Sequence, residues 1–256
     1  MSARNDFTLS PNKNGEYWLQ KEVIKSFSRI NDNHIFFDVG ANIGEWSNSL
    51  LDIASNKKIN CDVHLFEPTF ETYTFLKNSD INKKQVKLNN LALSNKTEEV
   101  MLFTSGSLCA VNSLYKNGSL QSEKIHAVTL DDYLKSEKIT HIDLLKSDTE
   151  GHDFRAMQGA EESLQKGKID IWQFEYNSKW INSRCYLKDV FDFVKDLDYV
   201  VAKISNNGIE IFEKWHPELE RFFEANYLLI KNNSKLIKEK CNYVTFDRYN
   251  VLINKK

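Results

Sequence analysis

The stretch that decides the fold is Phe36-Phe37-Asp38-Val39-Gly40-Ala41-Asn42-Ile43-Gly44. Within it an apolar run ends on an acid, a glycine turn follows, and a helical pattern begins. In an α/β protein this order places the carboxyl end of the first strand against a nucleotide-like ligand. The glycines let the backbone approach that ligand, because they carry no Cβ. The start of the helix offers it free N–H groups.

A second apolar strand, residues 63–66, ends on Glu67. A carboxylate at this position can accept hydrogen bonds from both hydroxyls of a ribose, since it has two oxygens. The glycine spacing distinguishes between ligands. A dinucleotide-binding turn requires G-x-G-x-x-G, whereas the matching positions here are Gly40, Asn42 and Glu45. The Glu45 carboxylate would repel a pyrophosphate, so the pattern favours a nucleoside with a positive centre, such as S-adenosylmethionine, over NAD.

Composition narrows the class of protein. The 256 residues suffice for one large domain with appendages, and 41% hydrophobic with 27% charged residues is typical of a globular protein. A net charge of −2 gives no basic excess for nucleic acid. No apolar run approaches the roughly 20 residues of a membrane helix, and the N-terminus lacks the apolar core of a signal peptide. The cysteines are scattered at positions 61, 109, 185 and 241, without a zinc or disulfide pattern. We therefore expect a cytoplasmic protein with neither nucleic acid nor a membrane as partner.

Hydrophobic periodicity predicts strands that alternate with helices. Strands are expected at residues 34–39, 63–66, 86–93, 100–103, 125–130, 141–146, 168–174, 199–204, 209–212 and 227–230. This alternation indicates an α/β fold with a doubly wound, mostly parallel sheet. The turn at residues 206–208 indicates a hairpin, and hence one antiparallel edge strand. We divide the chain into a helical extension (residues 1–33), an α/β domain (34–231) and a polar C-terminal tail (232–256).

Five segments resemble, in this order, the FkbM-type methyltransferases. They are Asp38 to Gly44, Phe66-Glu67-Pro68, Asn90 to Ser94, Thr129 to Tyr133 and Ile142 to Asp153. The resemblance implies a Rossmann-like class I methyltransferase fold for residues 34–231 and S-adenosylmethionine as cofactor. It also implies O-methylation, typically of a hydroxyl on a sugar or a polyketide-like product. Residues 147–151 read Ser-Asp-Thr-Glu-Gly, where the family more often has Ile-Asp-Val-Glu-Gly, but both acids are kept.

The candidate cofactor-binding residues lie in these segments and in the long polar loop of residues 104–124. They are Asp38, Gly40, Asn42, Gly44, Glu67, Asn90, Ala92 and Ser113. A loop of this length is usually functional or mobile. We expect Ser113 in this loop to reach the carboxylate of the cofactor.

Candidate metal ligands follow from the chemistry of the acceptor. An alcohol attacks a methyl group only when a general base or a metal ion lowers its pKa. Asp148 ends one middle strand and Glu175 ends the next, and neighbouring strands lie about 5 Å apart. Two carboxylates this close repel unless a proton or a cation lies between them. We therefore hypothesise a divalent metal ion, Mg²⁺ or Mn²⁺, bound by Asp148, Glu175 and His152.

A second interpretation of the same residues needs no metal ion. Asp148 then hydrogen-bonds the amino group of the cofactor or caps the following helix. The general base is Glu150, His152 or Asp148 itself, and these three are the candidate catalytic residues. His152 can also be a locally satisfied capping residue without a chemical role. Chelation of the metal distinguishes the two interpretations.

The sequence thus predicts an S-adenosylmethionine-dependent O-methyltransferase. Its expected acceptor is a small-molecule carbohydrate, either a sugar nucleotide or a glycan precursor in polysaccharide biosynthesis. One alternative is an RNA or protein methyltransferase, which requires a basic or peptide-binding surface. Another is a non-catalytic partner that binds S-adenosylmethionine, but a protein without activity has no need of acids at positions 148, 150 and 175. The sequence makes no prediction about the oligomeric state.

Overall fold

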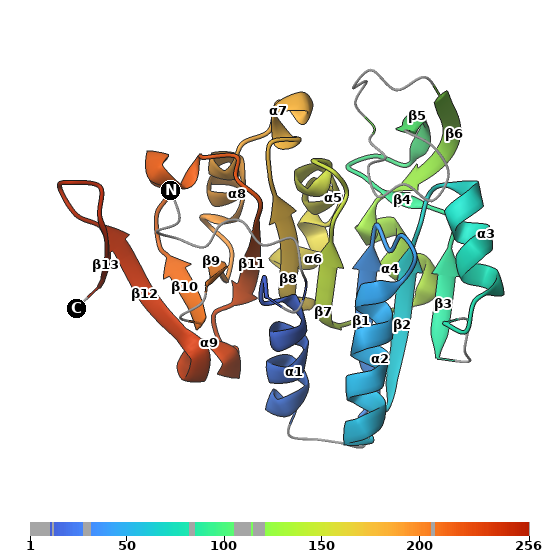
Figure 1. Cartoon of the computed structure of the whole chain (residues 1–256), viewed down its shortest axis with the longest axis horizontal. Helices are drawn as coiled ribbons and strands as arrows, with labels where there is room; N and C mark the ends of the chain where they lie inside the picture. Colours follow the sequence, from blue (N-terminus) through green and yellow to red (C-terminus); the bar gives the residue numbers. More distant parts are fainter. Residues whose placement is uncertain are drawn as a thin grey trace.

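The structure is a computed structural model that describes residues 11, 13–27, 32–81, 85–104, 114, 121–205 and 208–255. The strands of its large sheet are β1 (His34–Val39), β2 (Cys61–Phe66), β3 (Val86–Asn89), β7 (Ile142–Ser147), β8 (Ile169–Tyr176), β9 (Tyr199–Ser205), β10 (Gly208–Phe212), β11 (Ala225–Lys231), β12 (Cys241–Phe246) and β13 (Leu252–Asn254). Within the described residues they lie in the order β13-β12-β10-β9-β11-β8-β7-β1-β2-β3 (Figure 1).

The half of this sheet that runs from β8 to β3 is parallel throughout. The chain builds outward from β1 through β2 to β3 and then returns to the other side of β1 to form β7 and β8. The order therefore reverses between β1 and β7. At such a switch point the loops that follow the two strands separate and leave a crevice for a ligand. The expected α/β, doubly wound sheet is confirmed.

The other half of the sheet is mixed rather than closed by one antiparallel edge strand. β11 lies between β8 and β9 and runs antiparallel to both. The expected hairpin is present as β9 and β10. The C-terminal residues, for which we expected only a polar tail, form α9 (Lys235–Lys240) and the strands β12 and β13. Only Val244 of β12 is buried, so this strand lacks the apolar pattern that would have predicted it.

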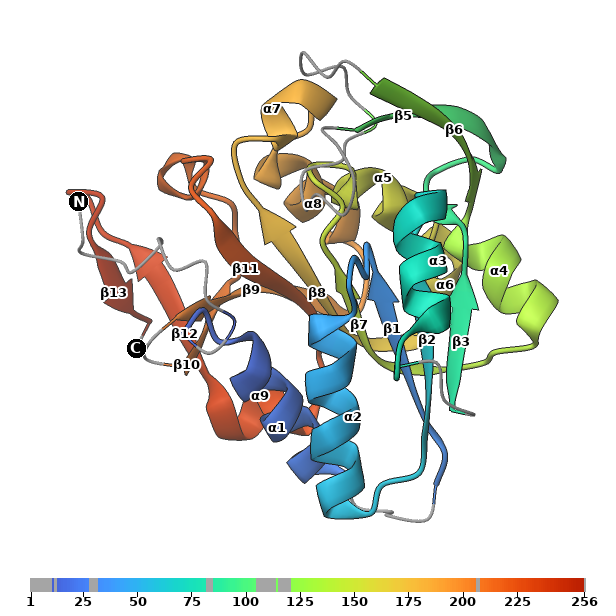
Figure 2. The ribbon, with the colours of Figure 1, turned by 45° about the vertical axis from the view of Figure 1, so that its right-hand side comes forward.

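A second, smaller sheet consists of β4 (Ala92–Leu93), β5 (Glu98–Thr104) and β6 (Gln121–Val128), in the order β4-β6-β5. The single strand expected at residues 86–93 is therefore divided between the two sheets. The break falls at Asn90, whose side-chain amide donates to the carbonyl oxygens of Glu67 and Pro68 at 3.0 and 2.8 Å. Figures 1 and 2 both place the small sheet beyond the carboxyl ends of β2 and β3, where it borders the crevice.

Two layers of helices cover the large sheet. The helices are α1 (Glu16–Ser26), α2 (Glu45–Lys57), α3 (Phe70–Asn78), α4 (Leu130–Glu137), α5 (Asp153–Gln158), α6 (Glu161–Gln165), α7 (Trp180–Ser183), α8 (Leu187–Val194) and α9, with a 3₁₀ turn at Pro217–Leu219. One buried cluster joins Phe37 of β1 to α4, α5, α6 and α8. The other joins Phe36 to α1, α2, α3 and α9. Adjacent residues of β1 thus face opposite layers, as the pleat requires. Figure 2 shows α1, α2 and α9 together on one face.

None of the helices in the described part of the chain has the length and apolar character needed to cross a membrane.

Candidate active site

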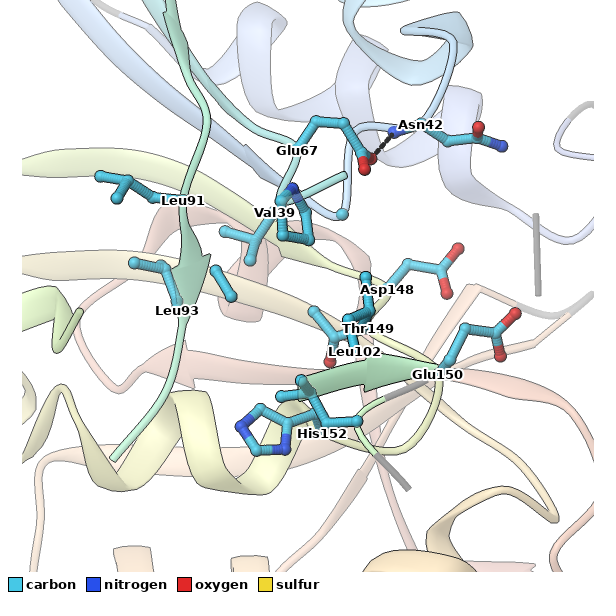
Figure 3. Close-up of a pocket in the computed structure, with 14 residues that line it drawn as sticks. Val39, Asn42, Glu67, Leu91, Leu93, Leu102, Asp148, Thr149, Glu150 and His152 are labelled. Carbon is cyan, nitrogen blue, oxygen red and sulfur yellow. Dashed lines mark hydrogen bonds between the residues drawn. The ribbon is translucent and has the colours of Figure 1, made fainter. Parts of the chain in front are cut away.

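The carboxyl ends of β1, β2 and β7 open into a cavity of about 610 Å³, counted with the open space at its mouth. We call it the first cavity. Its apolar wall consists of Val39, Pro68, Leu91, Ala92, Leu93, Leu102 and Leu114. The rest of the lining is Gly40, Asn42, Glu67, Asp148, Thr149, Glu150 and His152. Figure 3 shows the carboxylates of Glu67, Asp148 and Glu150 among these side chains. An apolar slot with a few convergent polar groups is typical of a site for a nucleoside-sized ligand.

The turn between β1 and α2 shapes the floor of the first cavity. Gly40 has a φ of +76°, and a Cβ at this position would lie 2.0 Å from the carbonyl oxygen of Asp148. Gly44 has a φ of +81°, and a Cβ there would lie 2.6 Å from Cδ1 of Ile81. Both positions therefore require glycine. Gly40 lines the cavity, whereas Gly44 is excluded from its lining and serves to pack α2 close to the segment that follows α3.

Glu67 places a carboxylate in the first cavity. Its Oε1 accepts from the amide and hydroxyl of Thr69 at 3.0 and 2.6 Å. Its Oε2 accepts from the backbone amide of Asn42 at 3.0 Å. Burial raises the pKa of Glu67, and these hydrogen bonds act against the increase. Because each carboxylate oxygen has two lone pairs, Oε2 retains room for one further donor, such as a ribose hydroxyl.

Two other candidate cofactor residues lie outside the lining of the first cavity, although we expected them in it. Asp38 is fully buried and accepts from the hydroxyl of Ser47 at 2.6 Å, so it ties β1 to α2 and does not line the first cavity. Asn90 holds the backbone after β2 through its amide and also lies outside the lining. Ala92 does line the cavity. Ser113 lies outside the described residues.

A second cavity adjoins the first, with about 1580 Å³ of empty space that includes open solvent. The two cavities share Gly40, Asn42, Asp148 and Glu150. The acids that line the second cavity are Glu16, Glu45, Asp148, Glu150, Glu175 and Glu224, and its basic residues are Lys146 and Lys179. Both lysines are ion-paired: Nζ of Lys146 lies 3.4 Å from Asp148, and Lys179 binds Glu150. The described lining therefore has a surplus of negative charge.

Three of these acids converge at the boundary between the cavities. Asp148, Glu150 and Glu175 each offer a carboxylate oxygen, and the three oxygens lie within 4.8 Å of one another. Glu150 adopts a φ of +57°, an uncommon conformation for a residue with a side chain. Gly151 follows it at +91°, and a Cβ there would lie 2.7 Å from the backbone of Lys179. Strained backbone of this kind persists where the surrounding structure enforces it, often at functional sites.

The charges of this group are strongly coupled. Burial and then the charge of Asp148 raise the pKa of Glu150 to about 7. The same two causes, in the same order, raise the pKa of Glu175 far above its usual range. Burial alone would lower the pKa of Lys146, but the carboxylates around it, first of all Asp148, raise it instead. Lys146 therefore keeps its charge beside Asp148. Among the described residues no ion pair reaches Glu175, whose Oε2 accepts from the side-chain amide of Asn177 at 2.6 Å.

His152 does not join this group, contrary to its expected place as a third ligand. Its Nε2 lies 3.0 Å from the hydroxyl of Ser94, on the side of the first cavity. Figure 3 shows its ring directed away from the carboxylates of Asp148 and Glu150. The positive φ angles of Glu150 and Gly151 reverse the chain between Asp148 and His152. Burial lowers the pKa of His152 to about 4, so its ring is neutral at neutral pH.

Comparison with known proteins identifies the family. Residues 38–201 match the methyltransferase FkbM domain. The chain belongs to the FkbM methyltransferase family. It is also 24% identical over 196 residues to the hexuronic acid methyltransferase AglP of Haloferax volcanii, which covers 73% of this chain and 78% of that protein.

A solved structure shares the fold of this FkbM methyltransferase. The crystal structure of methyltransferase FkbM from Methylobacillus flagellatus matches it with a TM-score of 0.50 and 16% identity. That match covers 78% of this chain but only 44% of the other. The CMeT domain of the citrinin polyketide synthase matches with a TM-score of 0.48 and 5% identity, over 84% of this chain and 50% of that one. The protein is thus an S-adenosylmethionine-dependent methyltransferase with a class I fold.

Sequence reasoning missed several residues of the site in this FkbM methyltransferase. Leu91, Leu93 and Leu102 of the apolar wall belong to segments expected only as strands, and Leu114 belongs to the long polar loop. Glu150 was considered only as a base, and its place beside Glu175 depends on a turn that periodicity does not reveal. Lys146 left a usable signal, because it is a charged residue in a strand buried along its whole length. Such residues are rarely buried without a partner.

Proposed function

We propose that the protein transfers the methyl group of S-adenosylmethionine to a hydroxyl of a carbohydrate bound in the second cavity. The observation that carries this proposal is the pair of adjoining cavities, which share Asp148 and Glu150. In this arrangement the adenosine lies against the apolar wall of the first cavity, and Glu67 accepts from its ribose. The sulfonium faces Asp148, whose carboxylate favours a positive charge. The methyl group then points to the second cavity.

We further propose a divalent metal ion at Asp148, Glu150 and Glu175. The close approach of three acids with too few cations supports it, because unpaired carboxylates in a partly buried site are costly. With Glu150 in place of His152 the ligands are all oxygens, which suits Mg²⁺ or Mn²⁺. When bound, such an ion lowers the pKa of a hydroxyl that it contacts. The ion pairs of Lys146 with Asp148 and of Lys179 with Glu150 would hold these two ligands in place.

A mechanism without a metal remains the alternative, with Glu150 as general base. Its pKa of about 7 favours this role, because a base works best when its pKa lies near the operating pH. Glu150 would then take the proton of the acceptor hydroxyl as the oxygen attacks the methyl carbon. The ion pair with Lys179 would fix the position of its carboxylate.

The charge of the second cavity restricts the acceptor. With every acid ionised, as metal binding would require, the six acids and two lysines of its described lining have a formal charge of −4. A bound S-adenosylmethionine adds one positive charge and a divalent ion adds two, which leaves about one negative charge. A phosphate or uronate next to the reacting hydroxyl would therefore be repelled. The relative AglP is named for a hexuronic acid, which supports a carbohydrate as acceptor, although the acidic lining here disfavours a uronate. The acidic lining favours a neutral or amino-bearing sugar at the reacting end and disfavours RNA.

Transfer of labelled methyl groups from S-adenosylmethionine tests this proposal. We expect label in neutral or amino sugar acceptors, at least ten-fold more slowly in the matching uronates, and none in bulk RNA. Treatment with EDTA should abolish transfer, and Mn²⁺ or Mg²⁺ should restore it. Asp148→Asn should lose most activity. Asp196→Asn removes an exposed acid that lines neither cavity and serves as the control that keeps activity.

Two results would contradict separate parts of the proposal. Full activity of the enzyme after removal of metal would exclude the ion and leave Glu150 as the base. Label in RNA or protein, with none in any sugar, would reject the carbohydrate acceptor.

A further inference from the structure

A second group of metal-ligating side chains lies at the opposite end of the sheet from the active site. His34 is the first residue of β1, His141 directly precedes β7, Asp143 lies in β7, and Asp170 lies in β8. A cavity with about 1000 Å³ of empty space, open solvent included, exposes His34, Asp143 and Asp170. The amino ends of three adjacent parallel strands bring these residues together.

The distances in this group are those of a coordination site. Nε2 of His141 lies 3.2 Å from Oδ2 of Asp170 and 3.8 Å from Oδ1 of Asp143. The three donor atoms all lie within 4.8 Å of one another. In a tetrahedral zinc site with bonds of about 2.0–2.1 Å, neighbouring ligand atoms are about 3.3 Å apart. The group therefore needs only small side-chain adjustments to surround an ion.

Neighbouring groups hold the carboxylate of Asp143 in place and approach that of Asp170. Asp143 is buried, and its Oδ1 lies 2.9 Å from Nδ1 of His34 while its Oδ2 accepts from the amide of Ile35 at 2.8 Å. Contacts of this kind orient metal ligands in proteins. Nζ of Lys231 lies 4.0 Å from Oδ1 of Asp170, so it approaches the carboxylate from the oxygen that does not face His141. The ion would thus meet one imidazole nitrogen, the preoriented carboxylate of Asp143 and the more exposed carboxylate of Asp170.

We propose that His141, Asp143 and Asp170 bind a divalent transition-metal ion of the zinc type, with solvent in the remaining coordination positions. Imidazole and carboxylate together suit Zn²⁺ better than Mg²⁺. The ion offsets the repulsion between two carboxylates on neighbouring strands. Five residues of strand separate Asp143 from Asp148, which is about 16 Å at the usual rise. The site is therefore independent of the methyl transfer, and its ion stabilises the amino ends of β7 and β8.

Zinc binding to the whole chain tests this proposal. The protein is stripped with EDTA and titrated with Zn²⁺ by calorimetry. Bound zinc is then measured by elemental analysis after dialysis. The Asp148→Asn variant neutralises one of the three acids at the active site, which weakens the binding of zinc at the carboxyl end of the sheet. In that variant we expect one equivalent of zinc and a rise in melting temperature.

The variant His141→Ala, made in the same background, should bind zinc at least ten-fold more weakly. His141 is partly exposed, at 44% of its side-chain surface, so the chain should still fold, which circular dichroism checks. His126→Ala removes an exposed histidine of β6 and is the matched control that should bind zinc normally. With cobalt(II), the His126→Ala control should show the visible absorption of an ion bound by nitrogen and oxygen, and the His141→Ala variant should not. Equal zinc binding by both histidine variants, or none in the Asp148→Asn parent, would overturn the proposal.

Discussion

Glu67 is the residue on which cofactor binding depends most directly. It is only 6% exposed, and its carboxylate is already held by three hydrogen bonds, so it is preorganised for a ribose. We expect Glu67→Ala to weaken S-adenosylhomocysteine binding by about 1–3 kcal/mol, the usual cost of losing hydrogen bonds to a charged group. Calorimetric titration measures this. Asp38→Asn is the control, since Asp38 does not line the cavity and its change should affect stability rather than affinity. Unchanged affinity in Glu67→Ala would reject the assignment.

Glu175 should lower the stability of the metal-free protein at alkaline pH. Burial and the charge of Asp148 raise its pKa in the folded state above its value of 4.5 in the unfolded chain. As pH rises above 4.5, the unfolded chain therefore ionises first, and the free energy of unfolding falls. Glu175→Gln cannot ionise. We expect the free energy of unfolding of the variant to exceed that of the wild type by roughly 1–3 kcal/mol at pH 8, and by much less at pH 5.

Thermal melts in EDTA at the two pH values measure this gap. The same variant should lose methyl transfer, because it lacks a proposed metal ligand. A gap that is equal at both pH values, or larger at pH 5, would show that Glu175 is not a buried acid with a raised pKa.

The sequence predicted individual residues well where a strand end alone decides their position. Gly40, Glu67 and Asp148 directly follow parallel strands, and Glu175 is the penultimate residue of β8; the structure brings all four around two adjoining cavities. The position of His152 was beyond this reasoning. It depends on the positive φ of Glu150, a residue with a side chain, which no local pattern indicates.

Among the elements, the turn between β1 and α2 tolerates little change. We expect Gly40→Ala to cost about 2 kcal/mol or more of folding stability, because the new Cβ would meet the carbonyl oxygen of Asp148 at a strained positive φ. Asn42→Gly is the matched change in the same turn. Asn42 also has a positive φ, of 47°, and glycine adopts it freely, so stability should change by less than about 1 kcal/mol. Urea unfolding measures both variants, and equal stability of the two would contradict this view of the turn.

Elements were predictable where their residues are buried in a regular pattern. β7 is buried along its whole length, and it stood out as an apolar run. β12 has one buried side chain, and β4 has two residues. Their places are determined by partners far along the chain, β10 and β6. Propensity cannot report such tertiary pairing.

In the whole molecule, the two halves of the large sheet contribute different parts of the site. The parallel half provides the crevice and most of the residues around it, and its order follows from right-handed β-α-β crossovers. For this reason the sequence could predict it. The mixed half, from β11 to β13, contributes the wall of the second cavity near Glu224 and depends on pairings that no crossover rule determines. The acceptor is therefore less predictable than the cofactor.

A structure of the protein with bound S-adenosylhomocysteine shows directly whether the cofactor lies in the first cavity with its ribose on Glu67. We expect the adenine to pack against Leu91, Leu93 and Leu102 in the first cavity, and a ribose hydroxyl to donate to Glu67. The sulfur should face Asp148, with the second cavity still free for an acceptor. A cofactor bound in the acidic second cavity, or a ribose without contact to Glu67, would contradict the account.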